Sequence, residues 1–184
     1  TAPSQLIAPG DLPRNILGDV ATRDHGEVPT ELLVYTQTSG DIPILRDQID
    51  KVNARVYETV NNGVYRCGFA RTQDAYDQAF RALFESLDWL EERLSRQRYL
   101  VGDQITEADW RLFPTLVRFD SVYVGHFKCN RNRIVDMPNL WGYLRELFQW
   151  PGVAATVNMD HIKRHYYMTH PSLNPTRIVP AGPQ

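Results

Sequence analysis

Apolar side chains recur every three or four residues along two long stretches of the chain, a spacing that places them on one face of an α-helix. Asp41 is a suitable N-cap for the first of these helices, and Pro43 suits its first turn. The run Asn61-Asn62-Gly63 is expected to end it, because glycine adopts the left-handed conformation of a helix C-terminus without strain. The apolar positions of this helix are Leu45, Ile49, Val52, Val56 and Val60.

A longer helix is predicted over residues 72–96, with Thr72 as its N-cap. Its apolar stripe is formed by Ala75, Ala79, Phe80, Leu83, Leu87, Leu90 and Leu94. Most of its charged residues fall on the opposite side, as expected for an amphipathic helix with one solvated face.

A third helix is predicted to begin at Thr106, within the run Ile-Thr-Glu-Ala-Asp at 105–109. The Thr106 hydroxyl can accept the amide of Asp109, and the Asp109 carboxylate can accept the amide of Thr106 in return. This reciprocal pair is a capping box. Apolar residues at helical spacing then continue the helix to Val122.

Shorter helices are predicted beyond a loop at 126–137. Pro138 is expected to open one helix, a short turn follows at 153–157, and Asp160 is expected to cap a last helix that ends near Met168. With five or six helices and no convincing sheet, the pattern predicts an all-α helical bundle over residues 41–170.

The two ends of the chain differ from this bundle. Prolines and glycines recur through residues 1–40, which predicts an extended N-terminal arm. Residues 171–184 contain four prolines and no periodicity, so an extended tail along the surface is expected there.

Composition narrows the classes of function. The chain has 184 residues, enough for one domain of ordinary size, and its net charge of -2 argues against nucleic acid as the main partner. No apolar run approaches the ~20 residues of a membrane span, and the start of the chain lacks the pattern of a signal peptide. The two cysteines give no disulfide framework, which fits a reducing, cytoplasmic setting.

Three tyrosines are the principal candidates for a binding site. Tyr65, Tyr123 and Tyr166 each lie at or near the end of a predicted helical segment, where the clefts of a bundle open. A neutral phenol offers one donor and one acceptor on a flat apolar ring. We expect the three to converge on a pocket for a small aromatic molecule that bears oxygens. The alternative is that each ring packs in the core with its hydroxyl satisfied at the rim.

Other candidates have simpler structural interpretations. Cys67 follows Arg66 and could be an activated nucleophile. Cations near Cys129 could lower the pKa of its thiol. For both cysteines, however, packing in the protein interior is the favoured role. His161 and His165 have metal-ligand spacing, yet Lys163 and Arg164 between them would repel a metal. Two basic patches could hold an anion such as a peptide carboxylate, although solvated surface is favoured. They consist of Lys128, Arg131 and Arg133, and of Lys163, Arg164 and His165.

Residues 41–183 resemble the C-terminal domain of the glutathione transferase fold, and Ile-Thr-Glu-Ala-Asp at 105–109 is the capping motif of that superfamily. The chain is more specifically similar to the glutathionyl-hydroquinone reductases, also called xi-class glutathione transferases. The segments that carry this resemblance are 61–70, 116–120 with Tyr123, 126–129, 157–162 with 165–166, and 174–176.

The resemblance implies a function. In this family a cysteine of an N-terminal thioredoxin-like domain attacks the sulfur of a glutathionylated hydroquinone, and a second glutathione resolves the mixed disulfide. Tyr65, Tyr123 and Tyr166 match tyrosines that line the substrate site, and a homodimer is also implied. Residues 1–40 do not resemble the thioredoxin-like domain or its Cys-Pro-Trp motif.

Two hypotheses follow. In the first, the chain is the substrate-binding helical domain of a glutathione-dependent reductase that acts on glutathionyl-hydroquinones, with no catalytic residue of its own. In the second, it is a non-catalytic interaction or dimerisation module, as similar domains are in some translation factors.

Overall fold

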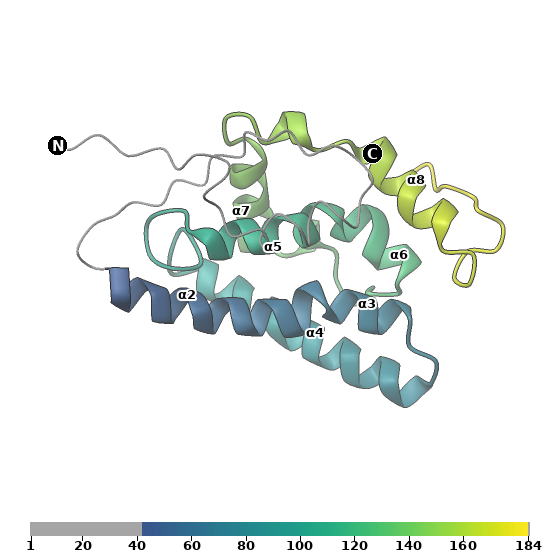
Figure 1. Ribbon diagram of the computed structural model, residues 1–184, viewed down its shortest axis with the longest axis horizontal. Helices are drawn as coiled ribbons and strands as arrows, with labels where there is room; N and C mark the ends of the chain where they lie inside the picture. Colours follow the sequence, from purple (N-terminus) through teal and green to yellow (C-terminus); the bar gives the residue numbers. More distant parts are fainter. Residues whose placement is uncertain (1–41, 184) are drawn as a thin grey trace.

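The computed structural model describes residues 42–183, and the predicted arm at 1–40 and the cap at Asp41 lie outside this range. The described chain is helical and contains no β-strand, so the predicted all-α bundle is confirmed (Figure 1). The helices are α2 (Ile42–Val56), α3 (Gly63–Gly68), α4 (Gln73–Leu94), α5 (Glu107–Arg118), α6 (Val124–His126), α7 (Pro138–Phe148) and α8 (Met159–Thr169). Two π-helical turns, η1 (Tyr57–Asn61) and η2 (Phe119–Tyr123), and two 3₁₀ turns, η3 (Ile134–Asp136) and η4 (Ala154–Thr156), complete the elements.

The core lies where α4 meets the helices around it. η1 and α3 pack against α4, while α2 packs against α5 and α7 packs against both α4 and α5. Leu83, Leu87 and Leu90 of α4 and Leu112 of α5 are completely buried. The predicted apolar stripe of α4 is therefore the centre of the fold. Thr72 caps this helix as predicted, since its hydroxyl accepts the amide of Ala75 at 3.2 Å.

A break does fall at Asn62, between η1 and α3, but the predicted left-handed conformation of Gly63 is wrong, and α2 already ends at Val56. From there the chain passes through the π turn η1 and continues into α3, and the amide of Asn62 donates to the carbonyl of Tyr57 at 3.0 Å. Val60 and Val64 are both completely buried. Because they extend the apolar stripe across the expected stop, burial of that stripe favours continued helix over a left-handed glycine.

A capping box forms at the start of α5, but the Thr106 hydroxyl donates to the Asp109 carboxylate at 2.9 Å, whereas the prediction has it accept the Asp109 amide. One carboxylate oxygen of Asp109 accepts the Thr106 amide at 2.7 Å, and the other accepts the Leu100 amide at 2.9 Å. The hydroxyl of Tyr143 in α7 also donates to Asp109, at 2.8 Å. Asp109 thus joins the preceding loop, α5 and α7 through one completely buried carboxylate.

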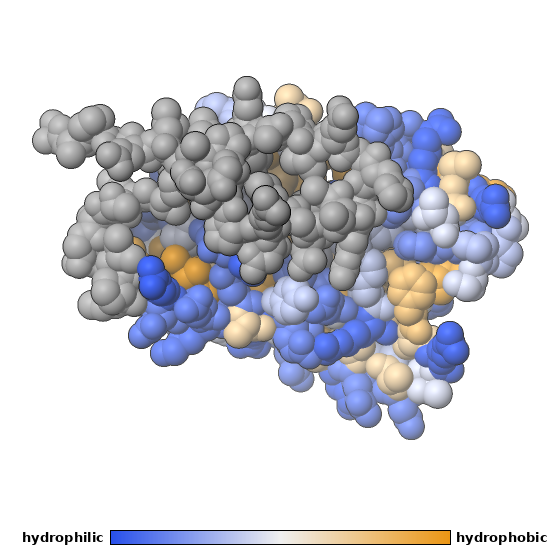
Figure 2. Space-filling model, in the orientation of Figure 1, coloured by the Kyte–Doolittle hydropathy of each residue, from blue (hydrophilic) through white to orange (hydrophobic). Residues whose placement is uncertain are grey.

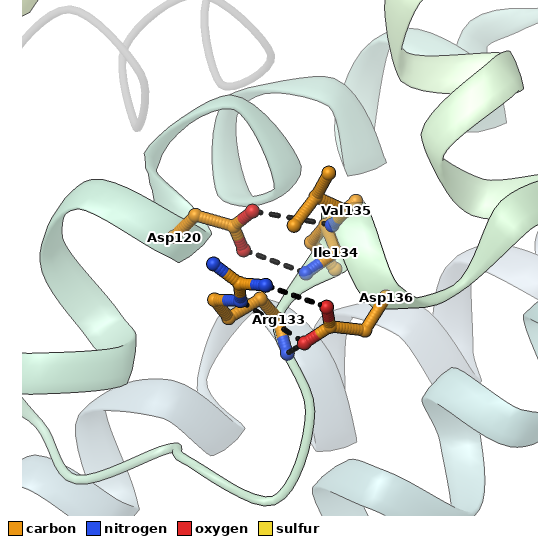
Figure 3. Close-up of polar contacts among 5 residues, drawn as sticks. All are labelled: Asp120, Arg133, Ile134, Val135 and Asp136. Carbon is orange, nitrogen blue, oxygen red and sulfur yellow. Dashed lines mark hydrogen bonds and ion pairs between the residues drawn. The ribbon is translucent and has the colours of Figure 1, made fainter. Parts of the chain in front are cut away.

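The segment predicted as a loop at 126–137 contains the 3₁₀ turn η3 and is fixed by two carboxylates (Figure 3). Asp120 accepts the amides of Ile134 at 2.6 Å and Val135 at 3.2 Å. Arg133 pairs with Asp136 at 2.8 Å. Burial raises the pKa of Asp120, although the two amide bonds oppose that rise. The loop that follows α6 is therefore held against η2 through Asp120.

The last helix is capped by Asn158, and the prediction of Asp160 as the cap is wrong. The Asn158 side chain accepts the amide of His161 at 3.0 Å, whereas Asp160 pairs with Arg164 at 2.8 Å. From the end of α8 to residue 183 there is no further helix, and this segment is held to α8 by Asn174, whose side-chain amide donates to the Tyr167 carbonyl at 2.7 Å. Within residues 42–183 no helix is long and apolar enough to cross a membrane.

Candidate functional site

The three predicted tyrosines come together from three elements of the fold. Tyr65 comes from α3, Tyr123 ends η2, and Tyr166 lies in α8. The Tyr166 hydroxyl lies 2.6 Å from that of Tyr65 and 2.9 Å from that of Tyr123. The three hydroxyls therefore form one hydrogen-bonded chain with Tyr166 in the middle.

The ring of Phe127 packs against the rings of all three tyrosines. Its ring centroid lies 5.2 Å from that of Tyr65, 5.4 Å from that of Tyr123 and 5.8 Å from that of Tyr166. Gly68 makes this arrangement sterically possible, because a Cβ at that position would lie 2.3 Å from the Phe127 ring. The completely buried Phe127 is thus the centre of the aromatic cluster.

The three phenols differ in their access to solvent. Tyr123 and Tyr166 are 2% and 4% exposed, whereas Tyr65 is only partly buried. Of the three hydrogen-bonded tyrosines, Tyr65 is therefore the one that a molecule in solution can contact most readily. This difference in solvent exposure among the three tyrosines could not be predicted from the sequence.

Both buried phenols are held in their neutral form. Burial, followed by the influence of the neighbouring tyrosines, raises the pKa of Tyr123 well above its usual value, and Arg118 offsets this only in part. The pKa of Tyr166 is also raised, mainly by burial. Neutral hydroxyls keep their protons, so the hydroxyls of these two tyrosines can act as hydrogen-bond donors.

A group of histidines beside the tyrosines was not identified as a site from the sequence. Nε2 of His126 lies 3.1 Å from Nδ1 of His170, and the two rings stack. The ring of His170 also packs edge-on against Tyr166, at 5.6 Å between centroids. His170 follows Tyr166 by four residues, and this helical spacing is the one signal that could have associated the two.

The burial of His126 and the partial burial of His170 disfavour the charged form of both imidazoles. Burial, with smaller effects of His170 and Lys128, lowers the pKa of His126 to about 4. Burial and His165 lower the pKa of His170 in the same direction. Both rings are accordingly neutral near pH 7.

The metal interpretation of His161 and His165 has no support in the geometry. His161 is exposed, and the His165 ring packs against Tyr166 at 5.2 Å between centroids. Throughout the described range 42–183, no group of three or more ligating side chains could hold a metal ion.

Neither cysteine is placed to act as a nucleophile toward a molecule in solution. Cys67 is 2% exposed and Cys129 is completely buried. A hydrogen bond with Cys67 and burial raise the pKa of Cys129, opposite to the lowering that the nearby cations suggest. In the basic loop, Arg131 pairs with Asp88 and Arg133 with Asp136, so both arginines already have protein partners.

Comparisons with known proteins place this fold and sequence in one family. The family described as the glutathione S-transferase C-terminal domain matches residues 73–146. The glutathionyl-hydroquinone reductase PcpF of Sphingobium chlorophenolicum is 62% identical over 138 residues, which are 75% of this chain and 44% of the relative. The chain thus spans less than half the length of that protein.

Solved structures agree with the sequence comparison. The glutathione-bound structure of the Escherichia coli K-12 homologue YqjG superposes with a TM-score of 0.77 and 53% identity, over 81% of this chain and 48% of that one. The xi glutathione transferase of Phanerochaete chrysosporium gives a TM-score of 0.76 and 53% identity, over 84% and 48%. Residues 42–183 therefore form a helical domain of the glutathione S-transferase C-terminal type, and their sequence and fold are similar to those of xi-class glutathione transferases and glutathionyl-hydroquinone reductases.

Proposed function

We propose that this chain is the substrate-holding helical domain of a glutathione-dependent reductase that acts on glutathionyl-hydroquinones. The observation that carries the proposal is the hydrogen-bonded chain of Tyr65, Tyr166 and Tyr123, with contacts of 2.6 and 2.9 Å. An oxygen-bearing aromatic ring matches a site of this kind, since it needs an apolar surface and a hydroxyl at its edge.

The three hydroxyls can all donate in the same direction, toward a bound ligand. If a ligand oxygen accepts the proton of Tyr65, the Tyr65 oxygen can accept from Tyr166, and Tyr166 can accept from Tyr123. Hydrogen bonds aligned in this way strengthen one another in a low-dielectric site. The two buried phenols would therefore stabilise partial negative charge on the oxygen of a bound hydroquinone without touching it.

Glutathione enters this proposal as the co-substrate and as part of the conjugate. The relatives include a glutathione-bound structure of YqjG, and their names describe reduction of glutathionyl-hydroquinones. The nucleophilic cysteine is expected in the thioredoxin-like domain of the family, because both cysteines among the described residues are buried. Binding and orientation of the conjugate, in a reducing cytoplasmic setting, are the tasks left to this chain.

Binding of a defined conjugate tests the proposal. The ¹⁵N-labelled chain is titrated with the thioether of glutathione and menadiol and followed by NMR, which detects dissociation constants up to the millimolar range. We expect saturable shifts, and a Tyr65→Phe variant should bind about five- to tenfold more weakly, the effect of one lost hydrogen bond. Tyr57→Phe is the matched control, because Tyr57 is 49% exposed on η1. Absence of binding to the wild type at millimolar conjugate would overturn the proposal.

The second candidate function is a non-catalytic interaction or dimerisation module. Large apolar side chains exposed at the end of α7 favour it, since Phe148 is 37% and Trp150 is 39% exposed. Self-association through such side chains would also give the homodimer that the family resemblance implies. Sedimentation velocity of the wild type and of Trp150→Ala tests this, and a dimer without conjugate binding would favour the module.

A further inference from the structure

Three partly exposed rings pack over the buried Phe127. Phe69 is 44% exposed, and Tyr65 and His170 are partly buried. Their centroids lie 5.4, 5.2 and 6.0 Å from that of Phe127. Because Phe127 itself has no exposed surface, these three rings form the part of its aromatic surroundings that solvent reaches. Figure 2 shows apolar surface in this region, where α3 and α8 approach each other.

This layer has an apolar centre and polar edges. The Phe69 ring meets the His170 ring edge-on, at 5.3 Å between centroids. A single exposed phenylalanine is ordinary on a protein surface, but Phe69 is continuous with a phenol and an imidazole. Flat aromatic surface bordered by a few hydrogen-bonding groups is the usual lining of a site for an aromatic ligand.

His170 has hydrogen-bonding capacity that the fold does not use. Its Nδ1 is engaged by His126 at 3.1 Å, whereas its Nε2 has no hydrogen-bond partner among residues 42–183. Only one proton can lie between the two imidazoles. If His126 donates it, Nε2 of His170 carries a proton and is a donor, and if His170 donates it, Nε2 is an acceptor. The pair can thus meet either a hydroxyl or a carbonyl oxygen.

We propose that Phe69 and His170 form the ligand-facing surface of this site together with Tyr65, with Phe69 against the ring of the hydroquinone and Nε2 of His170 hydrogen-bonded to one of its oxygens. The inference rests on the proposed function and changes its residue assignment. Tyr123 and Tyr166 become positioning residues, because they are too deeply buried to touch the ligand and act through Tyr65.

The position of Phe69 is set by Gly68 in front of it. A Cβ on residue 68 would lie 2.3 Å from Cδ1 of Phe127, so the backbone approaches that ring as only glycine allows. The short helix α3 therefore presents Tyr65 and Phe69 on the same support, Phe127. His170 lies just beyond the end of α8 and is the third ring of this layer.

The test uses the same NMR titration with the thioether of glutathione and menadiol. Phe69→Ala should weaken binding about tenfold, the effect of losing an aromatic contact. The control Tyr57→Ala removes a comparably exposed aromatic ring from η1 and should leave affinity unchanged. In the wild type, the ¹⁵N resonance of His170 Nε2 should shift on addition of the conjugate, a readout that needs no substitution.

The outcomes separate this inference from the proposed function. If the conjugate binds and Tyr65→Phe weakens binding, while Phe69→Ala has no effect and the His170 resonance does not move, the ligand-facing surface lies elsewhere and only this inference is overturned. If the wild type does not bind the conjugate, the proposed function fails and this inference fails with it.

Discussion

The hydroxyl oxygens of Tyr65 and Tyr166 lie 2.6 Å apart although the two residues are 101 positions apart in the chain. This contact joins α3 to α8, the last described helix. Tyr166 also contacts the hydroxyl of Tyr123 at 2.9 Å. A single oxygen therefore holds together three elements, which makes its removal informative about stability as well as about binding.

Replacement of Tyr166 by Phe should destabilise the fold by about 1–3 kcal/mol, because it leaves the buried hydroxyl of Tyr123 without its hydrogen-bond partner among the described residues. Urea unfolding followed by circular dichroism measures the change. Tyr57→Phe at an exposed position should alter the free energy of unfolding by less than about 0.5 kcal/mol. Equal stability of Tyr166→Phe and the wild type would show that the buried hydroxyls are satisfied by other means.

Two glycines in helices should respond in opposite directions to replacement by alanine. At Gly68 a new Cβ would lie 2.3 Å from the Phe127 ring, and we expect a loss of about 1–3 kcal/mol in the free energy of unfolding. At Gly142 in α7 nothing lies within 4 Å of such a Cβ, and alanine should add up to about 1 kcal/mol. Thermal unfolding of both variants compares them directly. A neutral Gly68→Ala would mean that Phe127 can move away at little cost.

The parts of the fold that local spacing determines were predictable from the sequence. The apolar stripe of α4, the cap at Thr72 and the capping box at Thr106 depend on neighbours within one or two turns. The left-handed conformation of Gly63 was mispredicted because the local preference of glycine competes with burial of Val60 and Val64, and that burial depends on α4.

The site was predictable only in part, for a similar reason. The phenols of Tyr65, Tyr123 and Tyr166 could be nominated by their places at helix ends, and the structure brings them together. Their order of burial, and the neighbouring pair of His126 and His170, come from contacts between elements distant in the chain. No periodicity in the sequence encodes those contacts.

Asp109→Ala should be among the most destabilising single substitutions, with a loss of at least about 3 kcal/mol. The change removes the acceptor for the amides of Leu100 and Thr106 and for the hydroxyl of Tyr143. Each buried donor left without a partner costs about 1–3 kcal/mol. Asp103→Ala, at an exposed position in the preceding loop, is the control and should be nearly neutral. Comparable denaturant midpoints for the two variants would contradict the central role of Asp109.

Acidification should destabilise the fold through His126. The pKa of this side chain is lowered by burial from the ordinary 6.5 to about 4, with His170 and Lys128 acting in the same direction. Between these two values the unfolded chain binds a proton that the folded chain does not, so the free energy of unfolding falls as pH falls. The contribution of a neutral His126 is fully present above about pH 6.5 and is lost progressively toward pH 4. Urea unfolding at a series of pH values from 4 to 8 measures this slope, and His126→Gln should flatten it because the glutamine does not titrate. His161→Gln, at an exposed histidine on α8, should leave the slope unchanged. A slope that persists in His126→Gln would assign the acid sensitivity to other groups.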